Sequence, residues 1–391
     1  MERNSIVDKL KIDIAEFVSI RRQIHMHPEL GFEEKSTSEL VATKLKKWGY
    51  DVHAGLAGTG VVGTLQCGTG TQTIGLRADL DALPIVEQSG KKWSSQEQGK
   101  FHGCGHDGHT TMLLCAAKYL AQTRNFNGTV HVIFQPAEET LHGGKQMIDD
   151  GLFHLFPCDK IFGLHNVPGL ALGEFYCRQG IMMASSDTIH IEINGIGAHG
   201  AMPEKGIDAV LIACHIVLAL QSIVSRNISP LESAVVTIGC IQSGDAPNVI
   251  NAKALLKLSI RALDKETRDI IIKRIQDISV SQAASFGAKA TINLINSCPV
   301  LINGIEATEL AMETAKSLVG NNRVHTISPQ MGSEDFAFML EEHPDGCYVL
   351  IGNGNEAGYF NLHNPGYDFN DDIIPIGAAY WVSLVESYLT K

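Results

Sequence analysis

Clusters of positive charge are missing from this sequence of 391 residues. Its 31 Lys and Arg residues are outnumbered by 43 Asp and Glu residues, and the formal net charge is -12. Binding to the phosphates of a nucleic acid needs Lys and Arg gathered in one place, so the composition argues against a nucleic-acid partner. We expect small molecules or other proteins as partners.

Long apolar runs are also missing. Residues 1–30 carry charges throughout and are typical of an amphipathic helix, without the apolar core of a signal peptide. The longest apolar run, near residues 209–220, contains Cys214 and His215 and is too short to span a bilayer. We therefore expect no membrane association.

Paired cysteine spacing is the third absence. The nine cysteines are scattered along the chain, which in a reducing compartment predicts free or metal-bound thiols rather than a disulfide framework. These features together predict a cytoplasmic protein. Apolar residues make up 44% of the chain and charged residues 19%, which is typical of a globular protein, and the length suits about two domains.

Four mostly apolar runs each lead into acidic residues or a histidine. They are TQTIGLRADLDALP, GTVHVIFQPAEE, KIFGLHNVP and GCYVLIGNG. Because they do not alternate between apolar and polar residues, they indicate strands buried on both faces of a sheet, with helices between them. The sequence therefore predicts an α/β fold with a mixed, mostly parallel sheet flanked by helices. In such sheets, ligands gather beyond the carboxyl ends of the strands.

The middle of the chain has a different pattern. The run DTIHIEING alternates apolar and polar residues, a helix is expected over residues 206–226, and SAVVTIGCIQ and ALLKLSIRALD follow as strands. A helix over 265–286 and the strand KATINLI complete the order β-α-β-β-α-β, which is typical of a ferredoxin-like α+β domain. We expect residues 186–296 to form such a domain, inserted into a catalytic domain made of residues 1–185 and 297–391.

Cys104 and His106 are candidate metal ligands. They lie two residues apart in a glycine-flanked turn, so their side chains can point to the same side. A thiolate with an imidazole favours zinc among the common metals. Taken alone, such a pair is more often a buried thiol beside a surface histidine. The metal site is favoured because residues of ligand type also occur at the ends of other predicted strands.

Glu138 and Glu139 are the second candidate feature. Adjacent carboxylates point in different directions, so one can bind a metal while the other acts as a general base. By itself the pair also fits a solvated acidic turn. In the same way, His165 fits a hydrogen-bonded histidine at a strand end, and His363 fits simple turn chemistry. Their common place at one sheet edge favours a single site.

Seven stretches resemble one enzyme family over nearly the whole chain. They are HPELGFEE, GLRADLDALP, CGHDGHT, FQPAEE, GLHNVP, GAHGAMPEKGIDAV and LHNPGYDFND, in the family's order. The family is that of the metal-dependent amidohydrolases, which includes bacterial hippurate hydrolases, other N-acyl-amino-acid deacylases and plant auxin-conjugate hydrolases, with carboxypeptidase G and aminoacylase as distant relatives. The runs MMASSD, LQSIVSRN and RALDKETR resemble the hippurate hydrolase branch in particular. The resemblance implies a zinc-exopeptidase-like catalytic domain.

The resemblance also implies a centre of two divalent metal ions, zinc or manganese. The implied ligands are Cys104, His106, Glu139, His165 and His363. Glu138 would be the general base. In the wider clan an aspartate bridges the two metals, and here Cys104 takes a comparable place. Whether Cys104 holds one metal or bridges two is left open.

Several neighbouring residues would support this centre. Asp79 resembles the family's catalytic-support aspartate, placed to steer a metal-bound histidine, and Asp81 is the competing choice. Asp107 would orient an imidazole beside the metal, with direct ligation as the alternative. His102 is assigned to the approach to the site, and His109 to the first turn of the following helix.

The inserted domain would contribute three residues. By resemblance, His199 reaches an active site, often that of the partner subunit, and polarises the scissile carbonyl. Asn248 and Arg261 match positions that hold the free carboxylate of the substrate, for which the planar fork of arginine is suited. Without the resemblance, a turn histidine, a loop amide and a solvated arginine describe the three better. The domain is also expected to mediate homodimerisation.

The implied activity is metal-dependent hydrolysis of the amide bond of N-acyl amino acids, with hippurate (benzoylglycine) as the best single substrate. Glu138 would take a proton from the attacking water and deliver it to the leaving amine, while His199 would help to hold the oxyanion. The alternative is a carboxypeptidase or dipeptidase acting on short peptides. A catalytically silent binding protein and a redox or metal sensor explain the intact set of residues less well.

Overall fold

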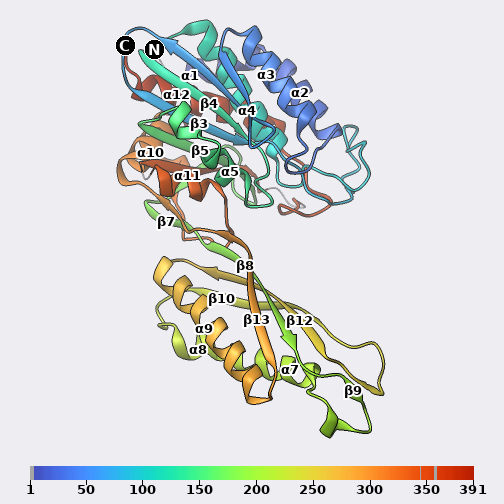
Figure 1. The fold of residues 1–391 in the computed structure, drawn as a ribbon. Helices are drawn as coiled ribbons and strands as arrows, with labels where there is room; N and C mark the ends of the chain where they lie inside the picture. The colour runs from blue at the N-terminus through green and yellow to red at the C-terminus, as the bar shows by residue number, and fades with distance from the viewer. Residues whose placement is uncertain (1–3, 344, 356–358) are drawn as a thin grey trace. The chain divides into compact units, whose positions relative to one another are not determined.

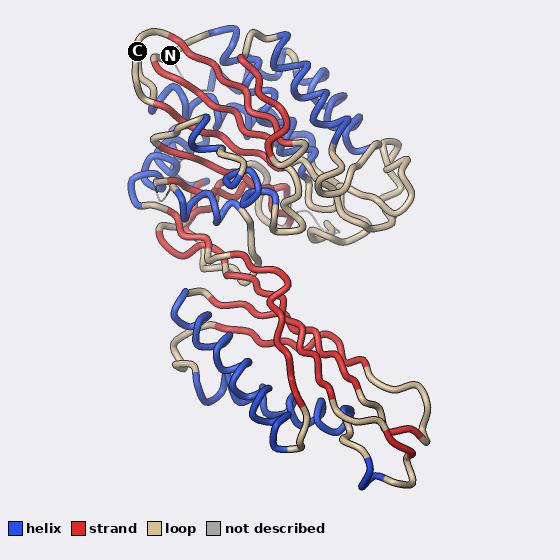
Figure 2. Tube along the Cα trace, viewed as in Figure 1, coloured by secondary structure: helices blue, strands red, loops and turns tan. Residues whose placement is uncertain are grey.

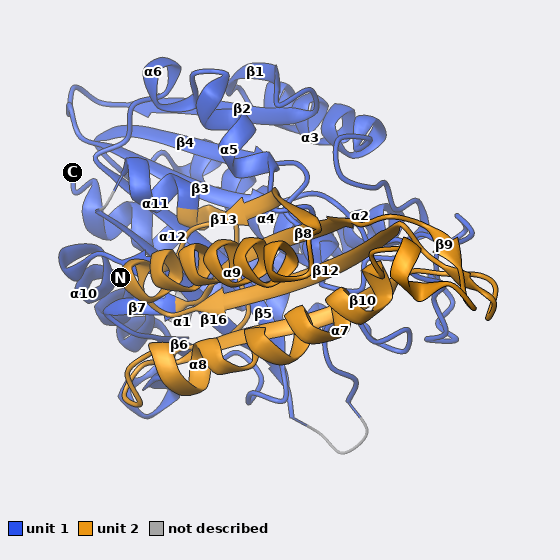
Figure 3. Ribbon diagram, turned by 60° about the horizontal axis from the view of Figure 1, so that its bottom comes forward, with its two compact units in different colours: residues 1–182, 302–328, 338–391 blue, residues 183–301, 329–337 orange. Residues whose placement is uncertain are grey.

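The computed structural model describes residues 4–343, 345–355 and 359–391, which divide into two compact units (Figure 3). Unit 1 comprises Met1–Met182, Ile302–Ser328 and Phe338–Lys391, and unit 2 comprises Met183–Leu301 and Pro329–Ala337. The insertion expected at residues 186–296 thus lies inside unit 2.

A short segment far along the chain also belongs to unit 2, and the sequence pattern did not predict it. Residues 329–337 join this unit because their backbone bonds to it: Ala184 N donates to the carbonyl oxygens of Gln330 and Gly332 at 2.9 and 3.0 Å. The Arg261 guanidinium donates to the Ser333 hydroxyl in the same segment. Such a return of the chain depends on long-range hydrogen bonds, which leave no periodic pattern in the sequence.

Unit 1 is built on a mixed sheet, which has eight strands within the described residues, in the order β1-β2-β4-β3-β5-β16-β6-β15. The strands are β1 Asp51–Leu56, β2 Gly60–Cys67, β3 Thr73–Asp79, β4 Gly128–Gln135, β5 Lys160–Pro168, β6 Phe175–Cys177, β15 Val324–Thr326 and β16 Gly346–Gly354. The four apolar runs are β3, β4, β5 and β16, which lie side by side and parallel at the centre of the sheet. β1 and β2 form an antiparallel edge.

The helices of unit 1 flank this sheet (Figures 1 and 2). They are α1 Asn4–Ile12, α2 Ile14–Met26, α3 Lys35–Lys47, α4 His106–Thr123, α5 Gly143–Asp149, α6 Leu152–Leu155, α10 Ile305–Val319 and α12 Ile374–Tyr388, with α11 Phe336–Glu342 and the short 3-10 turns η2 Asn321–Arg323 and η3 Asp371–Ile373. Large side chains such as Phe17, Phe134, Phe162 and Trp381 are buried between helices and sheet. The predicted fold class, a mixed, mostly parallel sheet flanked by helices, is therefore confirmed.

Helix α4 places the site at one end of this core. Nearly all of its side chains are buried, and it packs against α2 and α12. The helix begins at His106, directly after Gly105, whose φ of 85° is in the left-handed region that favours glycine. That sharp entry turns Cys104 and the first helical residue toward the ends of the neighbouring strands.

Unit 2 has the expected order β-α-β-β-α-β. Its elements are β8 Ser185–Asn194, β9 Ala198–His199, η1 Pro203–Lys205, α7 Ala209–Leu220, α8 Ser222–Asn227, β10 Ala234–Gln242, β11 Val249–Ile250, β12 Lys253–Ala262, α9 Lys265–Ser285 and β13 Lys289–Cys298. The four long strands form an antiparallel sheet in the order β10-β12-β8-β13. Alternate residues of β12, such as Leu256, Leu258 and Ile260, are buried in the core of this unit with side chains of α7 and α9. The strands β7 Gly180–Met183 and β14 Leu301–Asn303 pair with each other.

One helical stretch of unit 2, Ala209–Asn227, is long and apolar enough to cross a membrane by length and composition, which is weak evidence for a membrane span. It consists of α7 and α8, which meet at Gln221. Ile212 and Ile216 pack into the core of the unit, but only 33% of the stretch is buried. The helix expected over residues 206–226 covers nearly all of this stretch, although only the apolar run near residues 209–220 was weighed as a membrane span.

Candidate metal centre

The predicted metal ligands of unit 1 come together beyond the carboxyl ends of β3, β4 and β5. Cys104, His106 and His165 each offer a ligand atom, and these atoms lie within 4.8 Å of one another. Cys104, Glu139 and His363 form a second group of the same size. The two groups have Cys104 in common. These residues would thus offer two divalent ions two groups of three candidate ligands.

Glu138 lies at the edge of the same cluster. It forms a third group with His106 and Glu139, and its Oε2 is 4.0 Å from His106 Nε2. The Nε2 atom of His363 is 3.4 Å from Glu139 Oε1, and the Cys104 Sγ is 3.5 Å from His165 Nε2. Adjacent glutamates thus face the cluster from one loop, as general-base and ligand roles require.

The donor set fits a bound cation. His106 Nε2 and Glu139 Oε1 are buried, and neither has a hydrogen-bond partner among the described residues. Burial would lower the pKa of His106, but the carboxylates of Asp79, Asp81 and Glu139 raise it to about 10. Burial, with Glu139 and Glu138 nearby, raises the pKa of the Cys104 thiol well above its usual value. Excess negative charge of this kind is stabilised when a divalent ion supplies the missing positive charge.

Hydrogen bonds orient the two ligand imidazoles. The Nδ1 atom of His165 lies 2.6 Å from the carbonyl oxygen of Asn166, and Nδ1 of His106 lies 3.2 Å from Asp81 Oδ1. An N–H on each Nδ1 satisfies these acceptors and leaves the Nε2 lone pair free for a metal. This is the arrangement that metal-ligating histidines need.

The contacts of Asp81 and Asp79 differ from those expected. Asp81 contacts the ligand histidine through Oδ1, and its Oδ2 accepts the backbone N–H of Glu139 at 2.9 Å. Asp79 is 3.9 Å from His106 Nε2 and instead bonds His109 at 2.6 Å and Arg77 at 2.8 Å. The competing choice, Asp81, therefore makes the direct contact expected of Asp79, because the chain turns after β3 ends at Asp79.

His109 has a larger part than its assignment to a helix turn suggested. Its ring is buried between Asp79 and Asn166, whose backbone N–H donates to His109 Nε2 at 2.9 Å. Its ring centroid is 4.4 Å from that of His165. The spacing of three residues from His106 was the available signal, since it places both histidines on one face of α4.

Asp107 does not contact the predicted ligands through a hydrogen bond in the described structure. Its Oδ2 lies 2.7 Å from His25 Nδ1 and 3.3 Å from Arg21 Nη1. It therefore orients the imidazole of His25 rather than one beside the metal, because residues 106 and 107 point in different directions at the start of α4. His102 is buried, and burial lowers its pKa to about 4.

The three residues predicted in the inserted domain all lie in unit 2. His199 pairs with Val249 in the short β9-β11 ladder, and Gly200 N donates to Asn248 O at 2.8 Å. Arg261 lies near the opposite end of β12, which begins at Lys253. At about 3.4 Å per residue the strand separates the two ends by roughly 27 Å. Asn248 and Arg261 thus lie toward opposite ends of the sheet of unit 2, and their role in holding the substrate carboxylate stays a prediction.

We expect Asp81→Asn to weaken metal binding about 10-fold to 100-fold, because it removes one of the two acceptors that hold His106 and the Glu139 amide. Isothermal titration calorimetry of the metal-free proteins with zinc or manganese measures the affinity. Asp51→Asn, at an exposed position in β1, is the matched control. Equal affinities in all three proteins would contradict the role of Asp81.

We expect the stability of the protein to fall as the pH rises from about 6.5 to about 9. Burial opposes the charge on His25, but Asp107 and Glu87 raise its pKa from 6.5 to about 9. The charged form is thus favoured in the folded state, so its contribution is complete below pH 6.5 and lost above pH 9. Thermal unfolding in the presence of a chelator should show a smaller fall in stability over this pH range for His25→Gln than for the wild type. His27→Gln, at a partly exposed histidine, provides the control. A fall in stability in His25→Gln as large as that of the wild type would refute the assignment of this pH dependence to His25.

Comparisons with known proteins identify the family. Residues 75–387 match the family model described as Peptidase family M20/M25/M40. The chain is 47% identical over 377 residues to the hippurate hydrolase of Campylobacter jejuni, covering 96% of this chain and 97% of that protein. It is 39% identical over 383 residues to IAA-amino acid hydrolase ILR1-like 2 of Arabidopsis thaliana, covering 96% and 85%.

A solved structure gives the same result. The YXEP protein of Bacillus subtilis, described as a dinuclear metal binding peptidase from the M20 family, has a TM-score of 0.82 and 30% identity, covering 97% of this chain and 99% of that one. The resemblance inferred from the motifs is therefore confirmed. The chain belongs to the M20/M25/M40 peptidase family and is homologous to its metal-dependent amidohydrolases and peptidases.

Proposed function

We propose that this protein hydrolyses the amide bond of N-acyl amino acids with two divalent metal ions, and that hippurate is its substrate. The observation that carries the proposal is the pair of ligand groups that share Cys104, with Glu138 beside them. Two relatives add support, because one is a hippurate hydrolase and the other acts, by its name, on an amino-acid conjugate.

Two ions with Cys104 as a shared ligand are part of the proposal. His106 and His165 would complete one set, and Glu139 and His363 the other. The B. subtilis relative described as dinuclear supports this number. Thiolate, imidazole and carboxylate ligands suit zinc or manganese. When bound, such ions lower the pKa of water and polarise a carbonyl group.

Glu138 would move the proton. Its side chain is largely buried beside the ligand cluster, so its carboxylate can accept a proton from the attacking water and return it to the nitrogen of the leaving amine. Asp81 accepts the backbone N–H of Glu139, the residue after Glu138, and so keeps the loop in place.

Substrate recognition would use residues of two subunits. His199 and Asn248 lie together at one end of unit 2, and Arg261 lies at the other. In a symmetric dimer, one site can receive Arg261 from its own chain and His199 from the partner. Exposed apolar residues support such an interface: Val210, Leu211 and Leu218 on α7, and Val235 and Ile241 on the edge strand β10.

A carboxypeptidase or dipeptidase activity on short peptides remains the alternative, since Arg261 would read a terminal carboxylate in either case. A cytoplasmic location also stays part of the proposal. It is supported by the nine cysteines, all of which are free thiols, as expected of a reducing compartment.

The central test is a substrate panel. Purified protein loaded with zinc or manganese should hydrolyse benzoylglycine faster than N-acetyl amino acids or dipeptides, and thorough chelation should abolish the reaction. Release of the free amino acid measures the rate. Activity that survives metal removal would refute the metal-dependent reaction, and faster cleavage of dipeptides would favour the alternative.

The general base is tested in the same assay. Glu138→Gln should lower turnover at least about 1000-fold, since the amide cannot accept the proton, while the metal content stays the same. Metal analysis of the variant separates loss of the base from loss of the ions. Retained turnover would remove Glu138 from the base role.

Shared sites predict complementation between two inactive variants. A heterodimer of a His199→Ala chain and a Glu138→Gln chain, purified through two different tags, has one complete site and should show about half of the wild-type activity. Each variant alone should be inactive. A heterodimer no more active than its parents, or a monomer by light scattering, would contradict the two-subunit site.

A further inference from the structure

The segment HMHPELGFEE, residues 25–34, has no part in the reaction proposed above, yet it contacts two of the loops that build the site. Ala82 N, one residue beyond Asp81, donates to the carbonyl oxygen of Glu29 at 2.8 Å. A Cβ added at Gly31 would lie 3.0 Å from the Cα and Cβ atoms of Ala137, one residue before Glu138. The segment is therefore packed directly against the backbone of the catalytic loops.

We propose that Glu34 is a positioning residue for Glu138, because its carboxylate holds the backbone of the loop that carries the general base. The inference rests on the proposed function, in which Glu138 transfers the proton. It assigns Glu34 no contact with the substrate or the metals.

The contacts of Glu34 carry the proposal. Its side chain is buried, its Oε1 accepts the backbone N–H of Ala137 at 2.9 Å, and its Oε2 accepts the Thr59 hydroxyl at 2.6 Å. Burying a carboxyl group is costly, and these two donors offset part of the cost. The group is thus committed to the loop rather than exposed to solvent.

Glu138 lies between two amides that are each held by a buried carboxylate. Glu34 binds the N–H of Ala137 on one side, and Asp81 binds the N–H of Glu139 on the other, also at 2.9 Å. Ala137 has a φ of 54°, a left-handed conformation that is unfavourable for a residue with a Cβ. A strained residue of this kind persists only when its surroundings hold it.

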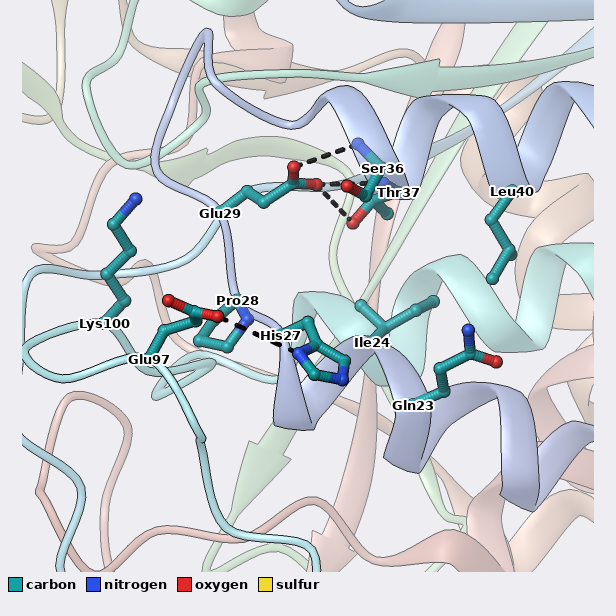
Figure 4. A pocket seen from close by; sticks show the side chains of 10 residues that line it. All are labelled: Gln23, Ile24, His27, Pro28, Glu29, Ser36, Thr37, Leu40, Glu97 and Lys100. Carbon is teal, nitrogen blue, oxygen red and sulfur yellow. Dashed lines mark hydrogen bonds and ion pairs between the residues drawn. The ribbon is translucent and has the colours of Figure 1, made fainter.

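Glu34 is itself fixed by a rigid turn. The Glu29 carboxylate accepts the backbone N–H groups of Ser36 and Thr37 at 2.9 Å each, at the start of α3 (Figure 4). On the same segment, His27 points instead toward the exposed Glu97, along an open pocket (Figure 4). The segment therefore makes two kinds of contact: Glu34 binds the loop that carries Glu138, whereas His27 faces the pocket.

The protonation behaviour of Glu34 makes glutamine a suitable probe. Burial raises its pKa to about 7, against the opposing effect of the Thr59 hydroxyl. The neutral acid is thus populated near neutral pH. A glutamine can imitate it, since its carbonyl oxygen accepts the Ala137 N–H and its NH₂ group donates to the Thr59 oxygen.

The experiment compares Glu34→Gln, Glu34→Asp and Glu34→Ala in the metal-loaded full chain. Positioning predicts that the Gln variant keeps kcat within about threefold, because it spans the same distance. The Asp and Ala variants should lose about 10-fold to 100-fold in kcat, since a small displacement of a catalytic group costs that much. KM should change less than about threefold, and the metal content should not change.

Hydrogen exchange gives a readout that needs no substrate. Amides of residues 137–141 should exchange faster in the Asp and Ala variants than in the wild type or the Gln variant. Glu33→Ala is the matched control, because the neighbouring Glu33 is exposed and pairs only with Lys100 among the described contacts of its side chain. It should keep wild-type kcat and exchange.

Two results would overturn the proposal. A wild-type kcat in Glu34→Ala would show that the loop needs no anchor. An active Asp variant beside an inactive Gln variant would show that the charge of the side chain matters rather than its length. If Glu34→Ala or Glu34→Asp does not fold, Glu34→Met tests the same contact, because methionine has a similar length but no carboxylate to accept the Ala137 N–H. Wild-type kcat and exchange in that variant would also refute the proposal.

Failure of the proposed function gives a different pattern. A wild type that cleaves no compound of the panel, or a Glu138→Gln variant that stays active, would refute the reaction or its base. The exchange of the amides of residues 137–141 would still report whether Glu34 holds the loop. Normal hydrolysis by the wild type with unaffected Glu34 variants would refute the positioning role alone.

Discussion

The buried negative charge around His106 is the constraint on which unit 1 depends. Isolated carboxylates are strongly disfavoured inside a protein, so each must be paired, hydrogen-bonded or bound to a metal. Asp79 is paired with Arg77 and His109. Glu139 and Cys104, by contrast, face a cluster in which His106 Nε2 has no hydrogen-bond partner among the described residues. Divalent ions are the natural solution for such a set of donors.

The remainder of the unit holds these donors in place mainly through backbone groups. The parallel strands β3, β4 and β5 end at a common edge, and α4 enters that edge through the left-handed Gly105. Asp81 and Glu34 then fix the amides on either side of Glu138. As the proposed base, Glu138 would need little reorganisation before reaction, because its backbone is held at two points, as preorganised catalysis requires.

Much of the fold was predictable because hydrophobic patterning is a local signal. Four apolar runs correctly indicated the central strands, and alternation correctly indicated the order of elements in unit 2. The ligand set came from a resemblance, and the structure brings its five members within reach of one another. The choice between Asp79 and Asp81 was not predictable, since it depends on how the chain turns beyond β3. The contact between Asp107 and His25 was not predictable either, because the two residues are 82 positions apart in the sequence.

The sequence by itself determined the α/β class, the inserted β-α-β-β-α-β unit, and which residues have the chemistry of metal ligands and a base. Periodicity and residue type carry this information, because they depend on neighbours along the chain. Only the tertiary structure decided that Cys104 is common to two ligand groups, that Asp81 contacts His106, and that β12 separates Asn248 from Arg261. Those facts depend on side-chain directions and on packing between distant segments, which no local pattern encodes.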